Sequence, residues 1–171
     1  HSIGMSVNVR KGRHYTDSKY DFTTKGWDVS AVSFHKLMNV LYNKNAMNEW
    51  GSIVALTYMA VQRVFPDYND MADNKAYLES IARSFGYFFG RDQKVRVNTI
   101  SQSPTPTTAG SGVKGFDGFL AYADQMSPLG NATALECADY TLSLFSDLTR
   151  KVTLQNLFHD GGFSNMGVST K

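Results

Sequence analysis

The chain has 171 residues, of which 42% are hydrophobic and 13% aromatic, enough for the core of one globular domain and too many for a disordered chain. Seventeen Lys and Arg residues against fifteen Asp and Glu residues give no support for nucleic-acid binding, which needs a clustered basic face. One cysteine excludes an intramolecular disulfide and favours a reducing cytoplasm, and no apolar run approaches the roughly 20 residues of a membrane helix.

The first third of the chain predicts a helix followed by a strand. Residues 11–24 are polar and turn-rich, which indicates a loop, or a loop that runs into a helix. From Trp27 to Leu41 apolar residues recur at helical spacing, and Gly51 ends that unit. Residues 52–57 are a short continuous apolar run, which is typical of a strand buried on both faces of a parallel sheet.

The middle of the chain predicts a second helix and a second strand. Asn69 and Asp70, after Pro66, are short polar residues that satisfy free amides at a helix N-terminus. Leu78 and Phe85 belong to one apolar face of that helix. Residues 95–100 predict the strand, and residues 101–115 predict a loop of a length that usually indicates function, often a lid.

The last third completes an alternating pattern. Residues 116–125 predict a short helix, Thr133 and Glu136 form a capping box for a helix that ends near Phe145, and residues 152–158 predict a strand. The order strand, helix, strand, helix, strand predicts an α/β fold with a parallel sheet. The residues 1–4 read like the end of a strand already in progress, so we expect the chain to be a fragment of something longer.

The stretch from Tyr58 to Lys75 is the most informative about chemistry. Tyr58 ends a strand, where ligands bind in open α/β sheets. We expect Tyr68 at the start of the next helix and Lys75 on the same face, about 10 Å further along the axis and leaning back toward Tyr68. A neutral phenol there can donate a hydrogen bond to a developing enolate oxygen. Judged by spacing alone, Tyr68 is more often a tyrosine at the boundary of the core and Lys75 a solvent-exposed lysine.

Taken together, these residues resemble the active-site stretch of bacterial enoyl-[acyl carrier protein] reductases, a divergent branch of the short-chain dehydrogenases. That branch has six residues between its catalytic tyrosine and lysine, as between Tyr68 and Lys75, and a second tyrosine ten residues upstream, matched by Tyr58. The resemblance covers essentially the whole chain in order. It extends from His1-Ser2-Ile3-Gly4 through residues 95–109 to 145–148 and 159–163.

The resemblance implies a role for each matched residue. Tyr58, Tyr68 and Lys75 would be catalytic: Tyr68 donates to the thioester oxygen, Lys75 holds the nicotinamide ribose, and Tyr58 borders the acyl pocket. The residues implied to contact the cofactor are Ser2, Ile3, Gly4, Lys75, Pro104, Thr105 and Thr107. The residues implied to face the substrate are Gly4, Met5, Ser6, Tyr58 and Tyr68. No metal is implied, and the four histidines are too scattered to hold one.

The resemblance also implies the fold and partners. They are a single Rossmann-like, doubly wound parallel sheet over residues 1–171, the C-terminal part of the short-chain dehydrogenase fold, with a substrate-binding loop and helix at 102–126. The N-terminal dinucleotide-binding half, with its glycine-rich turn, is missing from the sequence. The implied activity is cytoplasmic NADH-dependent reduction of a trans-2-enoyl chain on acyl carrier protein, by a homotetramer that needs neither membrane nor nucleic acid.

Departures from the family pattern keep two alternatives open. Thr105 stands where an apolar residue is usual. Lys114 matches a basic carrier-protein contact of the family, but Asp117 and Gly118 occupy positions that are basic in some relatives, which leaves the place of the docking surface open. One alternative is another short-chain dehydrogenase that reduces a ketone, which the six-residue spacing disfavours. The other is an inactive fragment that serves only as an interaction module. Tyr15 and Lys19 have the three-residue spacing of the catalytic pair in ordinary short-chain dehydrogenases, but no predicted strand precedes them, so we assign them no catalytic role.

Overall fold

The computed structural model describes residues 4–107 and 115–168 and contains a parallel three-stranded sheet in the order β1-β2-β3. The strands are β1 (Ser52–Thr57), β2 (Arg96–Gln102) and β3 (Asn156–His159). Ser52 of β1 pairs with Arg96, and Thr99 of β2 pairs with Asn156. The expected α/β fold with a parallel sheet is therefore confirmed.

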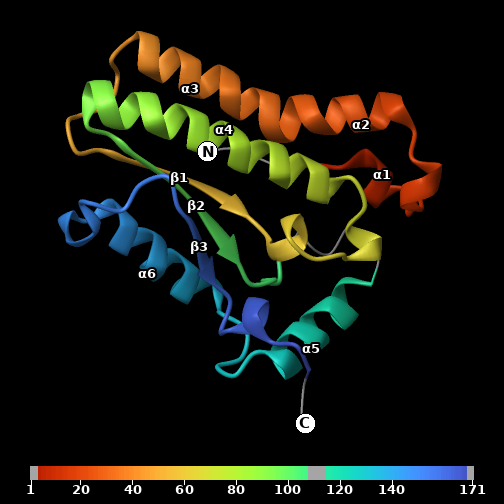
Figure 1. Ribbon diagram of the computed structural model, residues 1–171. Helices are drawn as coiled ribbons and strands as arrows, with labels where there is room; N and C mark the ends of the chain where they lie inside the picture. The colour runs from red at the N-terminus through yellow and green to blue at the C-terminus, as the bar shows by residue number, and fades with distance from the viewer. Residues whose placement is uncertain (1–3, 108–114, 169–171) are drawn as a thin grey trace.

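Helices lie on both faces of the sheet (Figure 1). One face of the sheet carries α2 (Tyr20–Trp27), α3 (Ser33–Asn43) and α4 (Met71–Gln93), with the short α1 (Val7–Arg10) beside α2. The other side carries α5 (Phe116–Met126) and α6 (Ala134–Phe145). Thr133 and Glu136 form the expected capping box of α6. In the described residues, no helix is long and apolar enough to cross a membrane.

The main core lies between α3, α4 and the sheet. Met38 of α3, Phe89 of α4 and Val97 of β2 are completely shielded from solvent and belong to one apolar cluster. Because α4 packs on β2 along its length and on α3 at its back, this 23-residue helix is fixed relative to the strand ends. The chemistry expected near its N-terminus therefore rests on a rigid element.

The helix that was expected to start at Trp27 starts earlier and contains a π turn. It begins at Tyr20, before the expected Trp27, and continues through a π-helical segment, Asp28–Val32, into α3. Of the two readings of residues 11–24, a loop or a loop that runs into a helix, the second is confirmed, because α2 begins at Tyr20. At the π turn Ser30 accepts a 2.8 Å hydrogen bond from the Met5 amide and donates one of 2.9 Å to the Met5 carbonyl.

Strand boundaries agree for β1 and differ for the other two. Strand β2 begins one residue after the prediction and ends two residues after it. Strand β3 is confined to Asn156–His159, because Leu154 adopts a left-handed conformation with φ of 63° and interrupts the expected strand at 152–158. The expectation that β1 is buried on both faces is wrong at Leu56, which is 54% exposed.

Trp50 closes the end of the sheet where β1 begins. Its φ of 63° is left-handed, and its amide donates a 3.0 Å hydrogen bond to the Lys94 carbonyl just before β2. Arg150 and Lys151 place their cations 4.7 Å and 4.9 Å from the ring. Cation–π contacts of this kind attach the segment before β3 to the start of β1.

Candidate functional site

A cleft of about 1010 Å³ runs along β1 and past its C-terminal end. Its lining brings together segments that are far apart in the sequence. The lining includes every predicted site residue that the structure describes: Gly4, Met5, Ser6, Tyr58, Tyr68, Lys75, Pro104, Thr105 and Thr107. Ser2 and Ile3 lie outside the described residues.

Aromatic rings form one wall of the cleft. The rings of Tyr58 and Tyr68 meet edge to face with centroids 5.3 Å apart, and Phe119 of α5 lies 6.5 Å from each of them. Phe65 stacks on Phe119 at 5.1 Å, and Phe163, in the turn after β3, packs against the same cluster. An apolar wall with two phenols suits a ligand that has a hydrocarbon chain and a polar group.

Tyr58 has a buried hydroxyl without a hydrogen-bond partner among the described residues. The residue is 8% exposed, and burial, followed by the neighbouring Tyr68 and Asp160, raises the pKa of its phenol well above the usual range. A buried, unpaired hydroxyl is costly and rare in proteins. It is the kind of group that a bound ligand satisfies.

Tyr68 and Lys75 do not share one helix, so the expected spacing along a single axis is wrong. Tyr68 ends a separate 3-10 turn, Pro66–Tyr68, and Asn69 has a φ of 45°, which breaks the chain direction before α4 begins at Met71. The Lys75 ammonium donates a 2.7 Å hydrogen bond to the Leu56 carbonyl of β1. The two side chains still line the same cleft.

Burial shifts the titration of both groups away from their ordinary values. It raises the pKa of Tyr68 far above the usual value for a phenol. It lowers the pKa of Lys75 to about 8, an effect that the Glu79 carboxylate partly opposes. At neutral pH the cleft therefore contains two protonated phenols and an ammonium group, all able to donate hydrogen bonds.

Residues 4–6 form the floor of the cleft beside Lys75. A Cβ atom added to Gly4 would lie 2.6 Å from the Met71 methyl and 3.5 Å from the Lys75 nitrogen, so only glycine fits without a rearrangement. The hydroxyl of Ser6 accepts a 3.0 Å hydrogen bond from the Val9 amide and donates one to the Asp70 carboxyl group. Ser6 thus faces the cleft with a hydroxyl that is already engaged.

The segment after β2 forms the opposite border. The Ser103 amide donates a 3.0 Å hydrogen bond to the His159 carbonyl, and Thr105 donates one of 3.2 Å to the Ser103 carbonyl. The Thr105 hydroxyl also lies 3.7 Å from the Cys137 sulfur. These contacts fix Pro104 and Thr105 at the end of β2, while residues 108–114, which include Lys114, lie outside the described residues.

Sequence reasoning missed two groups of functional interest. Asn69 and Asp70 were expected to supply helix-capping chemistry, but the Asp70 side chain does not cap α4. It accepts hydrogen bonds from Asn8 and Thr23 instead, and so anchors α1 and α2. Phe119 was also missed as a cleft residue. Its spacing of three from Phe116 was a signal for one apolar face of α5.

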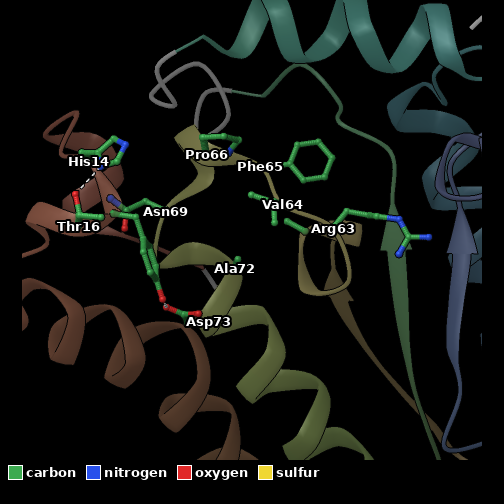
Figure 2. Close-up of a pocket in the computed structure, with 11 residues that line it drawn as sticks. His14, Thr16, Arg63, Val64, Phe65, Pro66, Asn69, Ala72 and Asp73 are labelled. Atoms are coloured by element: carbon green, nitrogen blue, oxygen red, sulfur yellow. Dashed lines mark hydrogen bonds between the residues drawn. The ribbon is translucent and has the colours of Figure 1, made fainter. Parts of the chain in front are cut away.

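A second, smaller pocket of about 390 Å³ is lined by Phe65 of the aromatic cluster (Figure 2). Its lining includes His14, Arg63, Phe65 and Asp73, and Figure 2 shows the Arg63 guanidinium directed away from His14. Tyr15 donates a 3.1 Å hydrogen bond to Asp73 there. The predicted catalytic residues line the larger cleft, which we therefore take as the candidate active site.

Comparisons with known proteins identify the family of this chain. The family model described as enoyl-(acyl carrier protein) reductase matches residues 1–164. The NADH-dependent enoyl-[acyl-carrier-protein] reductase FabI of Bacillus subtilis is 37% identical over 95% of this chain and 62% of its own length. The crystal structure of the FabI–NADH complex from Alistipes finegoldii is similar with a TM-score of 0.96 and 66% identity, over 99% of this chain and 60% of that one.

The reductase of Plasmodium berghei, crystallised with triclosan, is 29% identical with a TM-score of 0.92, over the whole of this chain and 59% of that one. The chain thus spans about three fifths of the length of the relatives that it matches. Those relatives have the Rossmann-like fold of the short-chain dehydrogenases, and the parallel sheet described above is part of it. The chain therefore belongs to the enoyl-(acyl carrier protein) reductase family.

Proposed function

We propose that residues 1–171 form the catalytic part of a Rossmann-like domain that reduces the double bond of a trans-2-enoyl thioester with NADH, and that residues 102–126 are its substrate-binding loop and helix. One observation carries the proposal: Tyr58, Tyr68 and Lys75 line a single cleft with the segments expected to face cofactor and substrate. The names of the relatives supply the cofactor and the substrate class.

The residues present fit a nicotinamide cofactor. The cleft is of ample size, Gly4 leaves an open approach beside the Lys75 ammonium, and Pro104 and Thr105 are held firmly at the end of β2. In this proposal Lys75 holds the ribose hydroxyls, and Ser2, Ile3, Gly4, Pro104, Thr105 and Thr107 border the cofactor. When bound, the cofactor supplies the hydride for the β-carbon of the substrate.

The chain itself supplies polarisation and an apolar channel. Tyr68 donates a hydrogen bond to the thioester oxygen as negative charge develops there, a contribution of about 3 kcal/mol for one well-placed donor. Its raised pKa keeps the proton on the phenol throughout the physiological range. Tyr58 and Phe119, which pack against Phe65, form the side of the cleft that receives the acyl chain, and Met5 and Ser6 also line the cleft.

The finer features of the family are part of the same proposal. The substrate is presented on acyl carrier protein, the enzyme acts in the cytoplasm, and four copies assemble into a homotetramer. The carrier-protein substrate is supported by the activity of the relatives, whereas the cytoplasmic location and the tetramer are implied only by the resemblance to the family. Size-exclusion chromatography with light scattering tests the tetramer directly.

The test of activity is the loss of NADH absorbance with a crotonyl thioester. We would compare the chain alone with a joined protein, in which the chain is fused to the part of the Alistipes finegoldii protein that it does not cover. Tyr68→Phe combined with Lys75→Ala is the inactive control. Activity of the joined protein that the double substitution abolishes supports the proposal, whereas equal activity of the double variant refutes the assignment of Tyr68 and Lys75.

Two alternatives are separated by the same assay. A joined protein that reduces a β-ketoacyl thioester and leaves the enoyl thioester unchanged is a ketone reductase. A joined protein that folds, as judged by circular dichroism, and reduces neither thioester supports an interaction module. The unpaired Tyr58 hydroxyl in the cleft favours an enzyme over the module, because a module gains nothing from a buried polar group without a partner.

A further inference from the structure

Charge is segregated between the two sides of the cleft. Residues 7–25, which form α1 and α2, contain five Lys and Arg residues against two Asp residues. Residues 115–145, which form α5 and α6, contain four Asp and Glu residues and no Lys or Arg. A molecule with net charge +2 thus has one basic and one acidic flank around its main cleft.

Both flanks reach the mouth of the cleft. Val9 and Arg10 of α1 line it on one side, and Phe116 and Phe119 of α5 line it on the other. Figure 1 shows α1 and α5 at the same end of the molecule, beyond the C-terminal ends of the strands. A partner that delivers a chain into this cleft can approach between them.

Three cations of the basic flank are available to a partner. Arg10, Lys11 and Lys19 are exposed, and within residues 4–107 and 115–168 none of them forms an ion pair. Lys19 lies over the Phe22 ring at 5.7 Å, a contact that leaves its ammonium in solvent. We call Arg10, Lys11 and Lys19 the basic rim.

The acidic neighbours do not neutralise this rim. Asp17 is paired with Arg13 at 3.4 Å, and Asp21 in the first turn of α2 is the remaining carboxylate of the segment. Arg13 itself is engaged further, because its carbonyl accepts a 2.7 Å hydrogen bond from Asn69. Lys25 of α2 is the fourth cation of the segment that forms no ion pair with a described residue, so these cations outnumber Asp21 and the segment keeps a net positive charge at this side of the mouth.

The rim is held in place by buried contacts. The Asn8 side chain accepts a 3.0 Å hydrogen bond from the Lys19 amide and donates one of 2.7 Å to Asp70. Lys19 is thereby fixed beside α1, and both are fixed to the start of α4. A pre-organised set of charges costs less to bind than one on a loose segment.

We propose that the basic rim is the docking surface for the protein that carries the enoyl chain, that this partner presents an acidic face to the rim, and that the chain enters the cleft past Arg10. This inference rests on the function proposed above, of which it specifies the partner surface. The acidic flank of α5 and α6 repels the same partner, which fixes its orientation. The cations are spread over α1 and the start of α2, an arrangement that suits a protein face better than a single phosphate group.

The test compares two substrates in the joined protein: an enoyl chain on an acidic acyl carrier protein and the same chain on N-acetylcysteamine. The variant is Lys11→Glu with Lys19→Glu, since neither residue lines the cleft. The matched control is Lys44→Glu with Arg91→Glu, at the C-terminal ends of α3 and α4, which Figure 1 places at the opposite end of the molecule.

At low ionic strength we expect the rim variant to lose about tenfold in kcat/KM with the carrier-protein substrate, because charge complementarity acts mainly on association. The control keeps its rate on that substrate, and both variants keep theirs on the small thioester. Added salt reduces the carrier-protein rate of the unmodified protein and has little effect on the rim variant. Lys11→Gln with Lys19→Gln, which is milder for folding, shows an intermediate loss.

Three outcomes contradict the inference: an unchanged rim variant, an equal loss in the control, or an equal loss on both thioesters. Inactivity of every protein on both thioesters would refute the proposed function instead. In that case the fluorescence anisotropy of a labelled carrier protein decides the docking separately. Binding that the rim variant weakens and the control does not supports the surface, and equal binding by both overturns it.

Discussion

The Asn8 side chain donates a 2.7 Å hydrogen bond to the carboxyl group of Asp70, which is 2% exposed and directly precedes α4. Thr23 of α2 donates to the same group at 3.0 Å, and so does Ser6. One buried acid thus ties α1 and α2 to the helix that carries Lys75. The floor of the cleft, residues 4–6, is thereby held against the start of α4, which carries Lys75.

Removal of this acid should destabilise the protein more than removal of an exposed one. We expect Asp70→Ala to lower the free energy of unfolding by about 3 kcal/mol, because several buried donors lose their charged acceptor. Asp73→Ala, which removes only the surface contact with Tyr15, should cost less than about 1 kcal/mol. Urea denaturation measures both. Equal losses would mean that the Asp70 network is not a structural anchor.

Tyr58→Phe separates a ligand-binding hydroxyl from a structural one. Because this buried hydroxyl has no partner among the described residues, its removal should leave the free energy of unfolding unchanged or raise it by up to about 1 kcal/mol. Activity of the joined protein should fall, since the hydroxyl faces the substrate side of the cleft. A variant that is destabilised and fully active would show that the hydroxyl serves the fold.

The Lys75 ammonium should give stability a distinct pH dependence. Its pKa is about 8 in the folded chain against an ordinary value of 10.5, so between these limits the unfolded chain binds the proton and the folded chain does not. Stability therefore rises with pH across that window. Lys75→Met lacks the titrating group. The free energy of unfolding of the native chain minus that of this variant should therefore rise from pH 8 to pH 10 and stay constant below pH 7. A constant difference in urea titrations would contradict the depressed pKa.

Two glycines of α4 form a matched pair. A Cβ at Gly86 would lie 2.5 Å from a Leu154 methyl and 3.3 Å from the Val97 Cβ, whereas at Gly90 the nearest atom is 3.9 Å away. Gly90→Ala should stabilise the chain by up to about 1 kcal/mol through helix propensity. Gly86→Ala should destabilise it by about 1 kcal/mol, because crowding at Val97 outweighs that gain. Thermal unfolding of both variants checks the signs.

The sequence predicted those elements whose signal is local. Strand β1, the capping box at Thr133 and the helix from Phe116 have apolar runs or caps that do not depend on distant residues. The left-handed Leu154 shortened β3, and its cause is tertiary: its amide bonds to the Val97 carbonyl at 2.9 Å. Leucine carries no sequence signal for such a conformation.

The resemblance predicted that the candidate residues lie together, but it did not predict the geometry between them. The resemblance assigned the candidates position by position, and all the described ones line one cleft. The break at Asn69 separates Tyr68 from the helix of Lys75, and only the hydrogen bond of Asn69 to the Arg13 carbonyl reveals why that conformation is held. Long-range contacts of this kind, like those of Asp70, have no periodicity that a sequence reader could detect.

Trp50 bears on how this chain can be followed in solution. The two tryptophans are Trp50, under two cations at the end of the sheet where β1 begins, and Trp27 at the end of α2, and neither lines the cleft. Their emission should therefore report on unfolding and stay nearly constant when a ligand fills the site. A spectroscopic signal for binding would have to be introduced, for example as Phe119→Trp on the aromatic wall.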